Sequence, residues 1–156
     1  MDLRLVSTTI CDDVLQNPAG RLTLHAIFRD LHADAYPAEV VRLHAVTTWF
    51  NGAQAAREVI ERVAITAPDG ELVADAATTF SVQAGAYHSQ ISRFRWLVLP
   101  TPGVYRVQVV AGAEVVADLP LLAAAPTVAT TVATVVDAEA ATGVVAGAIQ
   151  ENREGV

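Results

Sequence analysis

Three residues with metal-binding side chains alternate along one short segment of the chain. If this segment is extended, Asp30, His32 and Asp34 all point to one side, because side chains alternate along a strand. Two carboxylates and an imidazole suit zinc or manganese, so one hypothesis is a metal-dependent enzyme centred here. The alternative is a solvated loop face, since so local a triad arises easily by chance.

A second acidic pair follows the first apolar segment, in Cys11-Asp12-Asp13. Paired carboxylates at the rim of a sheet can bind calcium, whereas the simpler interpretation is a buried cysteine followed by two turn residues. No matching acidic run recurs, so we expect no bound metal and no cofactor. Cys11 is the single cysteine, which excludes an internal disulfide and a multi-cysteine zinc site.

The remaining residue types do not form a catalytic pattern. His25, His44 and His88 are scattered, although His25 and His44 could be cross-strand neighbours, and Ser89 is next to His88 in sequence only. There is no Gly-x-Ser-x-Gly motif and no phosphate-binding glycine loop. All ten basic residues are Arg, so no lysine is available for Schiff-base chemistry. We therefore predict that the protein is not an enzyme.

Composition narrows the class of partner. The chain has 156 residues, 53% of them hydrophobic and 17% charged, with a net charge of −7. Excess negative charge repels phosphate groups, so we expect neither nucleic-acid nor membrane binding. A surface poor in charge indicates cover by a protein partner, either in a homo-oligomer or in a larger assembly. The Ala- and Val-rich, Lys-free composition suggests a bacterial or phage source. We expect a cytoplasmic location, or one within a virion or other assembly, because Met1–Arg4 does not begin a signal peptide.

The candidate residues above would be positioned by short apolar segments that Gly and Pro turns separate. These segments predict an all-β fold, an antiparallel sandwich of about eight strands. The expected strands are Leu3–Ile10, Arg21–Phe28, Val40–Phe50, Glu58–Ala67, Glu71–Val82, Gln90–Leu99, Val104–Val110 and Glu114–Leu122. Between the second and third strands, Asp30–Glu39 should be a loop or an irregular strand. We place the domain at 1–122 and an Ala/Val-rich C-terminal tail at 123–156.

Alternation along the later strands predicts which side chains form the core. The expected core residues are Phe94, Trp96, Val98, Tyr105, Val107 and Val109. Trp49 and Phe50 are consecutive, so a regular strand must turn one of them away from the core. This pair is therefore a candidate contact surface for a protein, a small ligand or a carbohydrate.

The tail is the second candidate contact element. Val128, Val132 and Val136 lie in a Val/Thr run, Thr127–Val136, that has strand propensity and no charge to discourage edge pairing. We expect this run to dock on a sheet edge or groove, of its own sandwich or of a neighbouring subunit. Residues Asp137–Gln150 are Ala-rich and could form a short helix.

Several motifs together resemble a family of small bacterial all-β proteins of unknown function. They are Cys11-Asp12-Asp13-Val14, Gly20-Arg21-Leu22-Thr23-Leu24 with Ile27-Phe28, Ala67-Pro68-Asp69-Gly70 and Pro102-Gly103-Val104-Tyr105. The resemblance covers Leu3 to Leu122 and implies an immunoglobulin-like or similar sandwich without an assigned catalytic residue. The leading hypothesis is a non-enzymatic interaction module with the tail as docking element. The alternatives are a small-ligand or carbohydrate-binding sandwich and the metal-dependent enzyme.

Overall fold

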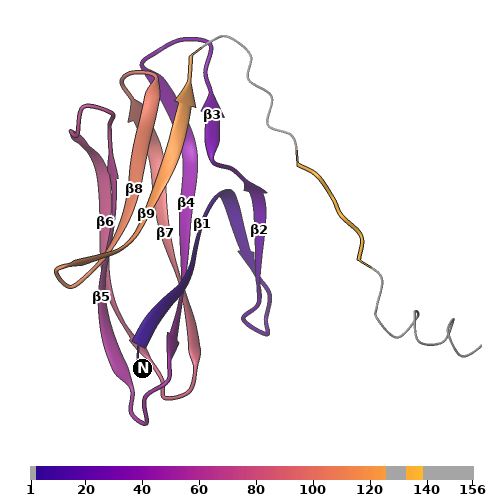
Figure 1. Cartoon of the computed structure of the whole chain (residues 1–156), viewed down its shortest axis with the longest axis vertical. Helices are drawn as coiled ribbons and strands as arrows, with labels where there is room; N and C mark the ends of the chain where they lie inside the picture. The colour runs from indigo at the N-terminus through magenta and orange to yellow at the C-terminus, as the bar shows by residue number, and fades with distance from the viewer. Residues whose placement is uncertain (1–2, 126–132, 139–156) are drawn as a thin grey trace, which may run out of the picture.

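Strands alone make up the regular structure of residues 3–125 and 133–138, the part of the chain that the computed structural model describes (Figure 1). The nine strands are β1 Leu3–Gln16, β2 Leu22–Ile27, β3 Asp30–His32, β4 Ala38–Asn51, β5 Arg57–Thr66, β6 Leu72–Val82, β7 Tyr87–Leu99, β8 Gly103–Ala111 and β9 Glu114–Ala124. Eight of them correspond to the expected strands, and β3 is the irregular segment before β4. None of the described residues forms a helix long and apolar enough to cross a membrane.

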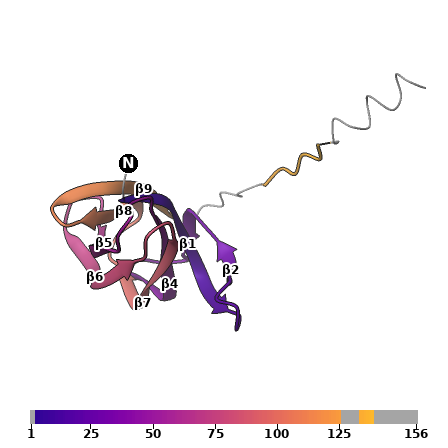
Figure 2. The ribbon, with the colours of Figure 1, turned by 90° about the horizontal axis from the view of Figure 1, so that it is seen from below.

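The strands form two sheets, ordered β2-β1-β4-β7 and β3-β9-β8-β5-β6. This arrangement confirms the all-β sandwich expected from the sequence, while its immunoglobulin-like character stays a prediction. The expectation of antiparallel pairing is wrong at one place, because β3 runs parallel to β9. Figures 1 and 2 both show the hairpin of β1 and β2 projecting to one side of the two layers.

Turn chemistry explains where the strands reverse. Between β1 and β2, the Asn17 side-chain oxygen accepts hydrogen bonds from the backbone N–H groups of Ala19, at 3.0 Å, and Arg21, at 2.9 Å. At the start of β8, Gly103 has a φ of +140°, and a Cβ there would lie 2.7 Å from the Pro68 Cγ. Only glycine fits this position without displacing the neighbouring turn.

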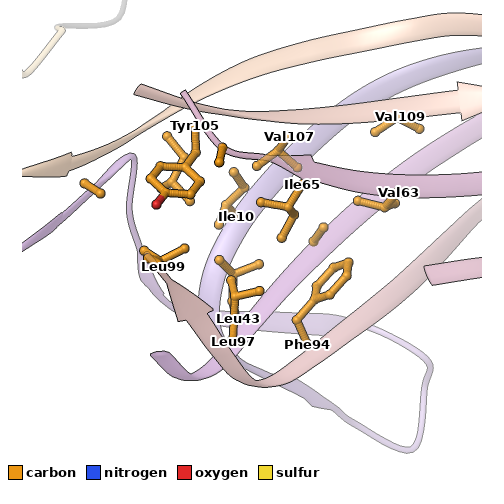
Figure 3. Packing of buried hydrophobic residues seen from close by; sticks show 14 of the residues in the cluster. Ile10, Leu43, Val63, Ile65, Phe94, Leu97, Leu99, Tyr105, Val107 and Val109 are labelled. Atoms are coloured by element: carbon orange, nitrogen blue, oxygen red, sulfur yellow. The ribbon is translucent and has the colours of Figure 1, made fainter. Parts of the chain in front are cut away.

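The core fills the space between the two sheets (Figure 3). Phe94, Tyr105, Val107 and Val109 are buried there, as the sequence predicts. The hydroxyl of Tyr105 donates a hydrogen bond to the backbone oxygen of Thr101 at 2.7 Å, so its one polar atom is satisfied. Burial of this continuous apolar cluster is what stabilises the sandwich.

The prediction that Trp96 and Val98 belong to the core is wrong. Trp96 is 62% exposed and Val98 48% exposed, whereas Leu97 and Leu99 are 4% and 1% exposed. The cause is the backbone of Trp96, whose φ of +57° lies in the left-handed region. This residue interrupts the strand alternation, so that Phe94 and Leu97 face the core instead of Phe94 and Trp96.

The sandwich ends slightly later than the predicted boundary after residue 122. Strand β9 continues to Ala124, and Ala123 and Ala124 are 1% and 8% exposed. The hydroxyl of Tyr36 donates a hydrogen bond to the backbone oxygen of Ala124 at 2.6 Å. Residues 123 and 124 therefore belong to the domain and not to the tail.

Candidate functional site

A groove of about 590 Å³ lies at one end of the sandwich, between the segment joining β2 to β3 and the first half of β4. One wall is made by residues 38–42 of β4 and the other by residues 26–28 and 30–33. Tyr36 and Leu99 also line the groove. Its lining therefore combines apolar side chains with a few charged ones, as small-molecule and peptide sites do.

The groove exists because β1 separates from β4 partway along its length. The two strands pair from Leu3↔Asn51 to Cys11↔His44, and beyond this point β1 pairs only with β2. Within residues 38–43 of β4, all but Val41 pair with β7 on one side, and no other described strand pairs with this stretch. One edge of β4 therefore faces the groove with its backbone groups open to a further strand. Ala26, in the opposite wall, has a φ of +51°, a left-handed conformation that is uncommon for alanine.

The carboxylates after Cys11 contact an arginine. The Arg42 guanidinium lies 3.4 Å from an Asp12 oxygen and 3.6 Å from an Asp13 oxygen. A calcium ion at this pair would have to compete with that guanidinium. Burial first, and then the charges of Asp13 and Asp12, raise the pKa of the Cys11 thiol above its ordinary value. The cysteine is fully buried, so it behaves as a structural residue and not as a nucleophile.

The alternating triad is only partly assembled. The His32 Nε2 lies 3.3 Å from an Asp30 carboxylate oxygen, and both residues line the groove. Asp34 is exposed and is not part of the lining. Over the described ranges, no group of three or more His, Cys, Asp or Glu side chains is arranged to hold a metal ion. Asp30 and His32 are thus neighbours, but they do not form a metal site with Asp34.

The histidines do not meet as cross-strand neighbours. His25 is on β2 and His44 on β4, and β1 lies between these two strands. His44 Nδ1 is 2.9 Å from the backbone oxygen of Asp12 and donates a hydrogen bond to it. His88, on β7, stacks on Phe80 with ring centroids 4.5 Å apart. His44 and His88 therefore contact different groups, and neither pairs with the strand that carries His25.

The consecutive aromatic pair divides as the alternation requires. Trp49 is 2% exposed, so the expectation that it offers a contact surface is wrong. Its indole N–H donates a hydrogen bond to Glu61 Oε2 at 2.7 Å. Phe50 faces outward, where its ring lies 4.8 Å from that of Tyr87 and 5.7 Å from the Arg4 guanidinium carbon. Of these two aromatic residues, only Phe50 remains a candidate contact residue.

Glu61 is a buried carboxylate between the two sheets, and the sequence analysis did not single it out. It is 1% exposed, and its Oε2 accepts hydrogen bonds from Thr47 Oγ1 and Trp49 Nε1, each at 2.7 Å. Its Oε1 is buried without a hydrogen-bond partner in the described structure. Thr47 and Trp49 belong to β4 and Glu61 to β5, so this network ties one sheet to the other.

Trp96 and Val41 are exposed apolar residues that the sequence analysis also missed. They occupy facing positions on β7 and β4, between the pairs Val40↔Leu97 and Arg42↔Arg95, and Val41 lines the groove. The available signal was the run of four apolar residues from Trp96 to Leu99, since a regular strand must expose two of them. Of the predicted tail contacts, Val128 and Val132 lie outside the described residues, and Val136 is 84% exposed.

Known structures share the fold at low sequence identity. The alkylpurine DNA glycosylase AlkC of Pseudomonas fluorescens, bound to DNA containing an abasic site analog, aligns over 80% of this chain and 31% of its own, with 15% identity and a TM-score of 0.52. The β-glucosidase of Listeria innocua, in complex with isofagomine, aligns over 78% of this chain and 16% of its own, with 16% identity and a TM-score of 0.50. This chain thus spans a minor part of either protein, and the similarity shows the fold alone.

Sequence comparison places the sandwich in a family. No curated protein matches the chain. The family model described as "Family of unknown function (DUF6941)" matches residues 6–124, which extend from within β1 to the end of β9. The protein therefore belongs to the DUF6941 family, as the resemblance to small all-β proteins of unknown function implies.

Proposed function

We propose that this protein is a non-enzymatic interaction module that assembles with copies of itself or within a larger complex, using the segment after β9 as its docking element. The observation that carries the proposal is the exposure of Val135 and Val136, each 84%. Both end the run Thr127–Val136, which consists only of Val, Thr and Ala. An uncharged β-branched run has strand propensity and nothing to discourage edge pairing. The proposal fits a cytoplasmic protein or a component of a virion or similar assembly.

The surface of the sandwich supports the same proposal. Ile27 is 61% exposed and Val41 50% exposed, and both line the groove; Trp96, opposite Val41, is 62% exposed. Large apolar side chains grouped at one end of a domain favour a surface that a partner covers.

Truncation tests the role of the tail. A chain that ends after Ala125 keeps all nine strands, so we expect it to fold and to have a lower oligomeric state than the parent by light scattering. A matched truncation after Ala138 removes only residues 139–156 and should keep the parent's number of chains per particle, because it retains Val135 and Val136. The proposal fails if the chain ending at Ala125 is folded, as judged by circular dichroism, and still forms particles with the parent's number of chains.

A second candidate function is small-ligand binding in the same groove. Its volume of about 590 Å³ lies within the range of roughly 300–1,000 Å³ typical of ligand sites. Arg42, Asp12 and Asp30 could orient the polar groups of a carbohydrate or similar ligand, while Phe28 and Leu31 cover an apolar face. A ligand screen by thermal shift tests this function. A ligand that binds in the groove should raise the Tm of the parent. It should not raise the Tm of the variant Ala33→Trp, whose larger side chain would fill the groove.

A further inference from the structure

We propose that the open edge of β4 in the groove, at Ala38–Arg42, accepts the segment Thr127–Val136 of a second copy of this chain as an added strand. This inference rests on the proposed self-assembly and deepens it, because it names the acceptor surface and the copy that supplies the strand. Strand addition to an open edge is a general mode of peptide recognition, in which backbone hydrogen bonds give the affinity.

The acceptor has the geometry of an incomplete sheet. Residues 38–43 of β4, all but Val41, pair with β7 alone among the described strands, while the far wall of the groove includes β3, the edge strand of the other sheet. Five residues of β4 present an edge of roughly 17 Å, at about 3.3 Å per residue. An extended segment in the groove would pair with this edge and cover the gap between the two sheets.

The lining of the groove suits an uncharged, β-branched occupant. Ile27 and Val41 expose apolar surface into it, and Phe28 and Leu31 lie in the opposite wall. Arg42, in the groove, already contacts Asp12 and Asp13. A strand of Val, Thr and Ala brings no charged side chain that would compete with these ion pairs.

The chain itself offers one segment of this kind. Residues 3–125 are used in the sandwich, and the Ala-rich residues after 137 include Gly143 and Gly147, which weaken a strand. Thr127–Val136 begins three residues after Ala124, whose backbone oxygen is bonded to Tyr36, a residue that lines the groove. Ala124, three residues before the segment, therefore lies close to the groove.

A second copy is favoured because both surfaces are uncovered within one chain. Residues 133–138 are all exposed and outside any strand, and Val135 and Val136 are each 84% exposed. Ile27 and Val41, in the groove of the same chain, are uncovered as well. Reciprocal exchange between two chains would cover both sets at once and would close the assembly with twofold symmetry.

A charge placed in the groove tests the acceptor. In the full-length chain, Val41→Asp should lower the number of chains per particle, measured by light scattering, as far as truncation after Ala125 does. The matched control is Val115→Asp on β9, because Val115 is also 50% exposed and does not line the groove, and it should keep the parent's oligomeric state. If truncation lowers the oligomeric state but Val41→Asp does not, the tail docks elsewhere: the proposed function survives and this inference is overturned. If truncation leaves the oligomeric state unchanged, both fail.

Disulfide trapping tests which copy supplies the strand and does not depend on the charge variant. One full-length chain carries Ala38→Cys, and a second chain of different mass carries Ala129→Cys or Ala133→Cys. After mixing and mild oxidation, we expect a cross-linked heterodimer in at least tenfold higher yield than with Ala77→Cys, an exposed position on β6, in place of Ala38→Cys. A third sample carries both cysteines in one chain. If a cross-link forms in this sample but not between the two singly substituted chains, each groove takes its own tail, which overturns the exchange.

Discussion

Removing one donor from the buried carboxylate should measurably destabilise the sandwich. Thr47→Val keeps the shape of the side chain but deletes the hydroxyl that donates to Glu61 Oε2 at 2.7 Å. Thr47 is fully buried and Glu61 is 1% exposed, so solvent does not reach the carboxylate to replace the lost donor. The other oxygen of this carboxylate, Oε1, already has no hydrogen-bond partner in the described structure. Leaving a buried acceptor short of a hydrogen bond costs about 1–3 kcal/mol. For a domain of this size, that lowers Tm by roughly 4–12 °C.

Urea denaturation followed by circular dichroism, at one fixed protein concentration, measures this free energy. Thr79→Val, at an exposed position on β6, is the matched control and should change stability by less than about 0.5 kcal/mol. Thr47→Val made on a Glu61→Ala background should also cost little, because the acceptor is gone, and the difference between the two backgrounds isolates the bond. If Thr47→Val is as stable as the parent, the reasoning is refuted, and the hydroxyl does not support the carboxylate.

Three further outcomes follow from the described contacts. Trp96→Ala should change the free energy of unfolding by less than about 1 kcal/mol, while Leu97→Ala should lower it by about 2–5 kcal/mol; equal effects in thermal melts would contradict the assigned register. Gly103→Ala should destabilise by more than about 1 kcal/mol in urea titrations, because its Cβ would meet a proline side chain and its φ disfavours alanine. The hydrogen bond from Arg106 lowers the pKa of Asp118 below its ordinary value of 3.8. The pair therefore stabilises the folded state fully at pH values above 3.8, and this stabilisation is lost as the pH falls through the lowered pKa. Asp118→Asn should therefore cost less than about 1 kcal/mol at pH 7, since the pair is largely solvated, and progressively less in acid melts; an undiminished difference well below pH 3 would exclude the ion pair as its cause.

The fold class could be predicted because turn chemistry and alternation are local. The Asn17 and Gly70 turns use backbone and side-chain bonds between residues a few positions apart, which the sequence displays directly. The register of β7 could not be predicted, because four consecutive apolar residues satisfy either phase and the left-handed backbone at Trp96 decides between them.

The groove depends on long-range pairing, which leaves little trace in local sequence. It forms where β1 leaves β4 for β2, and the start of β1 gives no signal for that change of partner. Glu61 is different, since it lies in phase with Val59, Val63 and Ile65 on the apolar face of β5. A carboxylate in that phase is a sequence signal for a buried polar network, and its partners on β4 then follow from the fold.

The way the chain leaves the sandwich also determines how the domain would bear a load. Strand β9 lies inside its sheet, with β8 on one side from Gly103↔Ala123 to Ala111↔Glu114 and β3 on the other near Ala124. A force applied at Ala124 along the axis of β9 would therefore act across hydrogen bonds that run roughly perpendicular to the strand. Such a pull strains many bonds together in shear instead of unzipping them one at a time. The central position of β9 in its sheet would thus make the C-terminal end of the sandwich mechanically resistant.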